Sequence, residues 1–396
     1  MRRIIITTSA LFVLSLAQAQ TGGIGTVLRS IAENNKELQA DEQLARAKSL
    51  EAQTDNNLSD PSVAYSYQFG SPSELGKTGE LTVTQGFDFP TLYGARSKVN
   101  KLKTQTFDTQ HQAFRRQLLL TAKELCLDLV LLNQEKALLD RRLENAGELA
   151  KLFELRLKTG DANILETNKI RMELMTVRTE ATTNESARMS KLQELVAMNG
   201  NQPLEFGDTG YGMGEQSGEP VGSMEQLRLE VIASDLDLLA LQSESEAARK
   251  QVSVSKSGWL PKLEVGYRRN TGEGELFNGF TVGGSIPLFE NRNKVKIAKA
   301  QSIAADLQKE SAFQKAEAGL VSLYNELQQL QVSLKAYDIP LMDETLELLK
   351  KALTARQISM IEYFTEVEAI YQGKLAYMQL ENRYQKLMAQ VYKNRL

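Results

Sequence analysis

The chain has 396 residues, a formal net charge of −3 and 24% charged residues, with one cysteine and one histidine. A single cysteine excludes a disulfide scaffold, and one cysteine with one histidine nearly excludes a zinc site or a cysteine–histidine catalytic pair. The almost neutral charge argues against a nucleic-acid-binding protein, which needs a concentrated basic face. No Ser/His/Asp set or cofactor motif is recognisable in the sequence, so we predict that the protein is not an enzyme and holds no cofactor or metal.

Residues 1–19 have the organisation of a secretory signal peptide. Arg2 and Arg3 precede an apolar run, and Ala17 and Ala19 are small residues at the positions that a signal peptidase reads. Beyond this segment, no stretch approaches the roughly 18 to 20 apolar residues that a membrane helix needs. We therefore expect a secreted chain that is either soluble or crosses a membrane as β-strands.

The first half, residues 20–200, combines strand and helix patterns. Apolar residues alternate with small or polar ones over 62–70 and 80–89, which is typical of strands with one apolar face. A long helix is expected over 94–158, because apolar residues recur there every seven positions, and a return helix over 163–199. At 1.5 Å per residue the long helix would measure roughly 95 Å. Its seam comprises Leu118, Leu125, Leu132, Leu139, Ala146 and Phe153.

Residues 201–225 are rich in glycine and proline and interrupt every periodic pattern. We expect a connector folded against the helices. A phosphate-binding loop is the alternative, which is disfavoured because no strand precedes the glycines and no Gly-Lys-Ser/Thr follows them.

The second half, residues 226–396, repeats this order of elements. Strands are expected over 261–269 and 279–288, a long helix over 292–355 and a return helix over 359–392. The halves align directly: Pro61 to Tyr67 matches Pro261 to Tyr267, and Ile164-Leu-Glu166 matches Met360-Ile-Glu362. Such an internal repeat predicts that both halves form the same kind of unit.

Pro340 lies inside the heptad pattern of the second long helix. Because Leu341 keeps the seven-residue register, we predict a kink at this proline and not the end of the helix.

The strands are long enough to cross a membrane. Runs of about nine to eleven residues with an apolar and a polar side match tilted transmembrane strands. The residues expected to point outward are Tyr65, Tyr67, Val83, Val265 and Val282. The alternative is a small soluble β-domain whose apolar face packs on the helices.

The number of strands then predicts an assembly. Four strands cannot close a barrel and open edges are not tolerated in lipid, so several copies must complete the sheet together. Three copies give twelve strands, which leave room for a lumen, and a homotrimer is the simplest solution.

These features, in this order and present twice, resemble the TolC-like outer-membrane efflux proteins. The motifs that carry the resemblance are Phe89-Pro-Thr-Leu92, Arg156-Leu-Lys-Thr-Gly160, Leu260-Pro261 and Ile286-Pro-Leu-Phe289. The resemblance covers essentially the whole mature chain. It implies a mostly α fold with a small β part, in which long antiparallel coiled-coil helices form an α-barrel. It further implies four transmembrane β-strands per chain, contributing to a trimeric twelve-stranded β-barrel.

The resemblance also implies a function and a location. The chain would be the outer-membrane channel of a tripartite efflux system in a Gram-negative-type envelope, extending into the periplasm. Its partners would be a periplasmic adaptor (membrane fusion) protein and an inner-membrane pump, and its cargo a heavy-metal cation or a drug. The competing hypothesis is a non-transport structural protein, either an envelope-spanning tether or a secreted coiled coil.

The tips of the two helical hairpins are the expected adaptor-contacting sites. By resemblance, the candidates are Arg156, Gly160, Asp161 and Ile164 in the first turn and Arg356 in the second. The second turn has Ala352 and Arg356 where the first has Arg156 and Gly160, so the two turns are not expected to contact the adaptor equally. Gly160 also fits the ordinary role of a C-cap glycine.

Three glutamates next to the turns are candidates for pore or gate acids. Glu166, Glu362 and Glu366 would form threefold rings of negative charge in a trimer, which is a common way to select cations. Each of them also fits an ordinary solvated surface position.

Overall fold

The computed structural model describes residues 23–72, 76–211, 222–272 and 275–396. The predicted signal peptide and residues 212–221 of the predicted connector lie outside these ranges. The chain forms two compact units, each drawing on both halves of the repeat, so the units do not coincide with the repeats. Among the described residues, unit 1 contains 23–34, 122–211 and 337–385, and unit 2 contains 35–72, 76–121, 222–272, 275–336 and 386–396.

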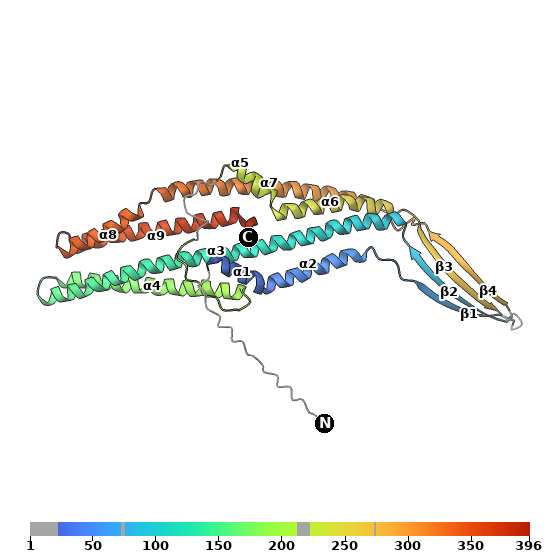
Figure 1. Cartoon of the computed structure of the whole chain (residues 1–396), viewed down its shortest axis with the longest axis horizontal. Coiled ribbons are helices and arrows are strands. Elements are labelled where there is room, and N and C mark those ends of the chain that lie inside the picture. Colours follow the sequence, from blue (N-terminus) through green and yellow to red (C-terminus); the bar gives the residue numbers. More distant parts are fainter. Residues whose placement is uncertain (1–22, 73–75, 212–221, 273–274) are drawn as a thin grey trace, which may run out of the picture. The chain divides into compact units, whose positions relative to one another are not determined.

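Unit 2 combines a small antiparallel sheet with helices (Figure 1). The strands are β1 (Ser62–Phe69), β2 (Lys77–Phe87), β3 (Lys262–Gly272) and β4 (Glu275–Ser285), in the order β1-β2-β3-β4. Its complete helices are α2 (Lys36–Thr54), α5 (Met224–Ala233), α6 (Leu236–Ser257), α7 (Lys294–Lys335) and the short η2 (Lys393–Arg395). The first part of α3 (Pro90–Lys158), residues 90–121, and the last residues of α9 (Met360–Val391), 386–391, also belong to unit 2.

The strand register places the apolar residues on one face of the sheet. Tyr65 pairs with Leu81, Val83 with Tyr267, and Val265 with Val282. Directly paired residues share a face, so all five residues predicted to point outward lie together. Tyr65 is 66% and Val282 83% exposed, so the helices of this chain do not cover that face as the soluble alternative requires.

Two strands are shifted relative to the sequence prediction. β2 begins at Lys77 and β4 at Glu275, because the hairpin pairing continues into the segments expected to be loops. β4 stops at Ser285, before Pro287, because proline has no N–H to donate to a ladder.

Unit 1 consists of two helical hairpins and a short helix, α1 (Ile24–Asn34). The first hairpin pairs the end of α3 (Pro90–Lys158) with α4 (Ile164–Met198), and the second pairs α8 (Ile339–Thr354) with α9 (Met360–Val391) (Figure 1). α3 begins at a proline, whose fixed φ suits the first helical turn. None of the helices in the described part of the chain has the length and apolarity that a membrane-spanning helix requires.

The core of unit 1 lies between the two hairpins. Phe153 of α3, Ile170 of α4, Leu353 of α8 and Tyr363 of α9 are almost completely buried in one cluster. Phe153 is also the last residue of the predicted heptad seam. The packing of this cluster therefore holds both helix turns at the same end of the unit.

The prediction of one kinked helix over 292–355 is wrong. α7 ends at Lys335 and α8 begins at Ile339, with Pro340 in its first turn. Asp338 caps the new helix, since its side chain accepts a hydrogen bond from the Leu341 N–H at 3.0 Å. The heptad register continues through the interruption, but a local cap together with a proline is sufficient to end one helix and begin another.

Residues 201–211 of the predicted connector lie against α3 in unit 1. Asn133 and Gln134 donate side-chain hydrogen bonds to the carbonyl oxygens of Asp208 and Thr209, each at 2.8 Å. Phe206 is 4% exposed, so this segment is packed as well as hydrogen-bonded.

Candidate functional site

The two turns at the end of unit 1 share one backbone hydrogen-bond pattern. In the first turn the Asp161 N–H bonds the Arg156 carbonyl at 2.7 Å, and in the second the Gln357 N–H bonds the Ala352 carbonyl at 2.8 Å. Each turn also has the inner bond of a Schellman motif, from Gly160 to Leu157 and from Arg356 to Leu353. The second turn is therefore built like the first, with Arg356 in the position of Gly160.

Both residues adopt the left-handed conformation that ends a helix. Gly160 has φ +76° and Arg356 φ +63°. Glycine adopts this conformation freely, whereas a side chain makes it unfavourable by roughly 1 to 2 kcal/mol. Gly160 thus has a structural reason to be glycine, and Arg356 holds a strained backbone.

Two arginine side chains connect the turns to each other. Arg356 Nη2 lies 3.3 Å from Asp161 Oδ2, and Arg156 Nη2 donates to the Thr354 carbonyl at 3.0 Å. Arg356 and Asp161 are both more than half exposed, so their ion pair contributes little to stability. The structure therefore brings Arg156, Gly160, Asp161 and Arg356 together at one tip.

The apolar side chains distinguish the two turns. Ile164 is 53% exposed and its neighbour Leu165 76% exposed, whereas Met360, which corresponds to Ile164 in the repeat, is 3% exposed. Ile361, which corresponds to Leu165, is 75% exposed. The tip consequently offers apolar surface from both turns, but Ile164 adds to it only in the first.

Two of the three candidate acids have a defined structural role. Glu166 accepts from the Asn163 N–H at 3.0 Å, and the Asn163 side chain accepts from the Glu166 N–H at 2.9 Å. Ser359 and Glu362 form the same reciprocal pair, at 2.8 and 3.2 Å. These are capping boxes, and the spacing of a cap residue and a glutamate three positions later makes them recognisable in the sequence.

The capping box also affects the charge of Glu362. Hydrogen bonding to Ser359, first from its backbone N–H, lowers the pKa of this exposed carboxyl below its ordinary value. Glu366, one turn further along α9, is exposed and lies outside the capping box.

The sequence analysis missed a buried arginine in unit 1. The Arg142 side chain is only 6% exposed, and it contacts Glu173 at 2.8 Å, Glu180 at 3.2 Å and Glu368 at 2.7 Å. Its guanidinium lies 5.0 Å from the centre of the Tyr371 ring. Burial lowers the pKa of Arg142, but the neighbouring carboxylates, Glu173 first, outweigh burial and raise it above its ordinary value.

Arg142 joins α3 to α4 and α9, and so links the two hairpins behind the tip. A signal for it was present in the sequence. Arg142, Ala146, Leu149 and Phe153 are the buried residues of this helix face, and their spacings of four, three and four follow the helical period.

The residue types that bind metals are dispersed. In the part of the chain that the structure describes, no three His, Cys, Asp or Glu side chains are placed to hold a metal ion. His111 Nδ1 lies 2.7 Å from Asp41 Oδ2 in unit 2. Cys126 is buried in unit 1, and burial raises the pKa of its thiol to about 12.

Both the sequence and the fold of this chain match known proteins. Residues 227–343 match the family described as outer membrane efflux protein. The transmembrane channel CusC has a TM-score of 0.77 at 14% identity, with 94% of this chain and 91% of that chain covered. The resemblance to the TolC-like outer-membrane efflux proteins is confirmed.

Two further TolC-like structures extend the comparison. The outer membrane protein VceC from Vibrio cholerae has a TM-score of 0.72 at 15% identity, covering 94% of this chain and 95% of that chain. The CmeC outer membrane channel from Campylobacter jejuni has a TM-score of 0.70 at 15% identity, covering 94% and 85%. No curated protein sequence matches the chain. At such identities the structural likeness establishes the fold, and the match to the outer membrane efflux protein family runs from within α5 to the first residues of α8.

Proposed function

We propose that this chain is the outer-membrane channel of a tripartite efflux system, through which cargo passes without energy input from the chain itself. The observation that carries the proposal is the fold, which follows outer-membrane channels over 94% of the chain. An inner-membrane pump and a periplasmic adaptor protein would deliver the cargo. That cargo, a heavy-metal cation or a drug, would be selected by the pump.

The sheet supports a trimer in the membrane. β1 and β4 are the edge strands, and all neighbouring strands are antiparallel. With an even number of strands per chain, β1 of one copy can pair antiparallel with β4 of the next. Three copies then close a twelve-stranded barrel with a lumen, and the exposed apolar face of each sheet turns toward lipid.

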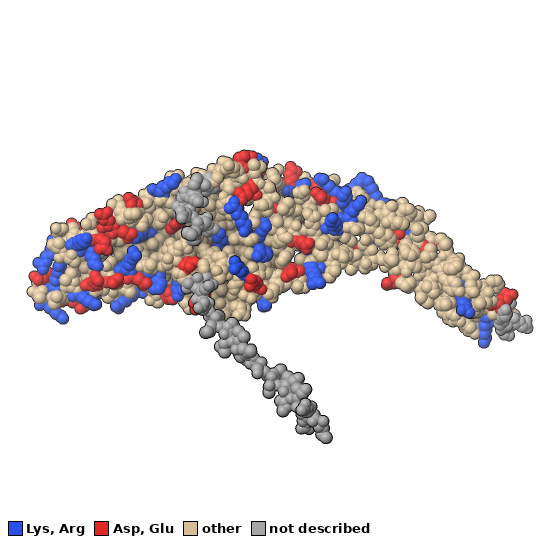
Figure 2. Space-filling view, in the orientation of Figure 1, with Lys and Arg blue, Asp and Glu red and all other residues tan. Residues whose placement is uncertain are grey.

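On the face shown in Figure 2, charged side chains are dense over the helices and sparser over most of the sheet. The polar face of the sheet includes the ion pair between Arg268 and Glu80, at 2.6 Å. A lipid-facing apolar side and a polar lumen side are what a water-filled barrel requires.

The tip of unit 1 is the proposed adaptor contact. Arg156, Gly160, Asp161, Ile164 and Arg356 would contribute to it, together with the exposed apolar side chains beside them. Of the proposed pore acids, Glu366 is the better candidate for a gate, because Glu166 and Glu362 already serve as helix caps.

Extraction and mass measurement test this function. The protein should remain with outer membranes in high salt, dissolve only in detergent and have the mass of a trimer there. A monomer or dimer in detergent would eliminate the barrel. Release by salt alone would favour the tether hypothesis.

A further inference from the structure

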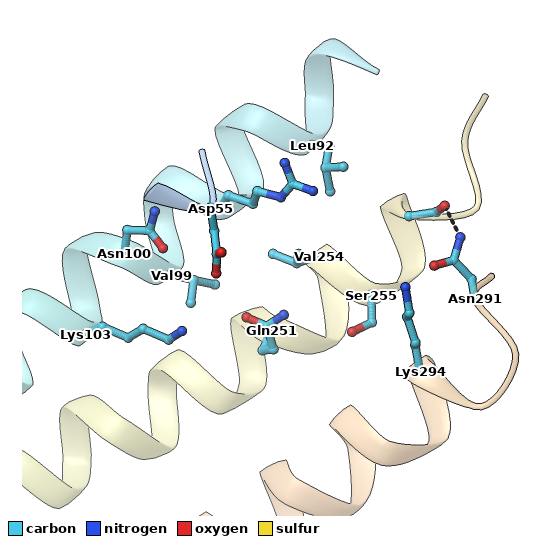
Figure 3. Close-up of a pocket in the computed structure, with 12 residues that line it drawn as sticks. Asp55, Leu92, Val99, Asn100, Lys103, Gln251, Val254, Ser255, Asn291 and Lys294 are labelled. Atoms are coloured by element: carbon cyan, nitrogen blue, oxygen red, sulfur yellow. Dashed lines mark hydrogen bonds between the residues drawn. The ribbon is translucent and has the colours of Figure 1, made fainter. Parts of the chain in front are cut away.

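A pocket of about 320 Å³ lies in unit 2 between α3, α6 and α7 (Figure 3). Polar side chains from all three helices line it: Arg96, Asn100 and Lys103 from α3, Gln251 and Ser255 from α6, and Lys294 from α7. Figure 3 shows Lys103 extending toward Gln251, and Lys294 extending from α7 toward α6.

The charge of the lining is predominantly positive. Three cationic side chains line the pocket against one carboxylate, that of Asp55. Arg96 is paired with Asp88 at 2.8 Å, and Lys294 lies 3.8 Å from Glu290. Lys103 makes no ion pair with any described residue, so its charge is not balanced inside the protein.

A buried amide in the lining has no partner. Asn100 is 8% exposed, and its carboxamide makes no hydrogen bond within the described ranges. Its amide atoms are not among the completely buried side-chain atoms that lack a partner in the described ranges, so they are accessible from the pocket. A polar ligand in the pocket would supply the missing partner.

The first turn of α7 adds an electrostatic attraction. Lys294 is the first residue of this 42-residue helix, and the N-cap residue Asn293 has φ +66° and makes no side-chain capping bond. The Lys294 N–H already donates to the Asn291 carbonyl at 3.2 Å. The positive end of the helix dipole still favours an anion at such a position.

We propose that this pocket binds a phosphate group. Lys103, Lys294 and the first turn of α7 would hold the phosphate oxygens, and Asn100 would donate to them. Phosphate matches the site because it accepts several charge-assisted hydrogen bonds at once.

The position of the pocket points to a phospholipid headgroup as the source. The lining residue Leu92 lies five residues after the end of β2, Gly258 lies four before β3 and Asn291 six after β4. If the strands span the outer membrane, the pocket lies at headgroup level. This assignment of the source rests on the proposed function, whereas phosphate binding does not.

The test uses the purified, delipidated full-length protein in detergent. Binding of inorganic phosphate and of a short-chain phosphatidylglycerol is measured by isothermal titration calorimetry. We expect Lys103→Gln and Lys294→Gln each to weaken binding by about tenfold. Lys101→Gln, an exposed lysine two positions away on α3 and outside the lining, should bind like the parent.

Asn100→Leu separates a ligand contact from a structural role. Because its amide has no partner, the substitution should leave the melting temperature unchanged or raised while it weakens binding. A lower melting temperature with unchanged binding would overturn the role of Asn100.

A comparison of phosphatidylglycerol with inorganic phosphate distinguishes a lipid headgroup from free phosphate as the source of the bound group. Tighter binding of the lipid than of phosphate supports a headgroup, and equal binding supports the site with free phosphate as its ligand. Binding of neither, or an equal loss in Lys101→Gln, overturns the proposal. The binding assay does not require a barrel. A monomer that binds phosphate would therefore refute the proposed function but not the site, and a trimer that does not bind phosphate would refute the site but not the proposed function.

Discussion

Arg356 occupies the same backbone position in the second helix turn as Gly160 does in the first. Both have positive φ, and the N–H of each donates to the carbonyl three residues earlier, at Leu353 for Arg356 and at Leu157 for Gly160. Glycine meets the conformational requirement of the turn, whereas arginine gains a contact with Asp161. The duplicated turns have therefore kept one geometry with different side-chain chemistry.

Arg356→Gly should raise the thermal stability of the tip. Glycine relieves the backbone strain, which we expect to gain about 0.5 to 1 kcal/mol, more than the exposed ion pair contributes. Arg356→Ala keeps the strain and loses the ion pair, so its melting temperature should lie below that of Arg356→Gly. Equal melting temperatures for the two variants would show that the turn is not strained.

Gly160→Val should impair export without preventing assembly. An added Cβ meets no atom within 4 Å, so the cost is backbone strain of roughly 1 to 2 kcal/mol confined to the turn. Export and adaptor cross-linking in cells should fall, while the trimer yield in detergent stays normal. Normal export would remove the adaptor role of this turn, and failure to assemble would make Gly160 a folding residue.

Val83→Arg should reduce membrane insertion. Val83 lies on the apolar face of β2, and an arginine facing lipid near the midplane costs about 2 to 4 kcal/mol. Thr84→Arg is the matched control, because the next residue along a strand points to the opposite face. The amount of heat-modifiable trimer in membrane fractions is measured for both variants. Equal yields would contradict the assignment of the two faces of the sheet.

Arg142→Met should destabilise unit 1. The substitution leaves three carboxylates without their shared cation, and because two of them are partly exposed we expect a loss of about 2 to 4 kcal/mol in unfolding free energy. Arg141→Met, at the exposed neighbouring position, should change it by less than about 0.5 kcal/mol. Denaturant titration measures the unfolding midpoint of each variant. Similar midpoints would show that the contacts of Arg142 with the three glutamates do not contribute to folding stability.

Glu135→Gln should stabilise the protein at neutral pH. Burial raises the pKa of Glu135 above its ordinary value, so the folded state disfavours the ionised form. The native state then binds the proton more tightly than the unfolded state, and stability falls as pH rises through that range. Glutamine should accept the hydrogen bond that Asn184 donates to Glu135 at 3.1 Å.

The advantage of Glu135→Gln should therefore be present at neutral pH and disappear at acidic pH, where Glu135 is protonated in both states. Melting temperatures across this range test it, with Glu144→Gln on the exposed side of α3 as a control for the loss of one charge. If Glu135→Gln kept the same higher melting temperature in acid, this would contradict the upward direction of the pKa shift of Glu135.

Local patterns in the sequence predicted the strands, the long helices and their order, apart from the division of the second long helix into α7 and α8. Alternation at Tyr65 and Tyr67 and the seven-residue spacing from Leu118 to Phe153 are local periodicities, and local periodicity is set by strand and helix geometry. The positions of the turns could also be predicted from the sequence. Gly160 is a typical residue for the left-handed conformation at the end of a helix, and the alignment of the two repeats places Arg356 at the corresponding position.

Contacts between residues that are far apart in the sequence could be recognised only in the folded chain. Glu173, Glu180 and Glu368 converge on Arg142 from two other helices, and no local pattern encodes that convergence. The same holds for Lys103 and Lys294, which lie 191 positions apart in the sequence and line one pocket. Even the break before Pro340 depended on whether Asp338 would cap a new helix, because a heptad register continues across either a kink or a restart. Contacts between segments, and a local cap that competes with a continuing helix, are both absent from the apolar periodicity of one segment.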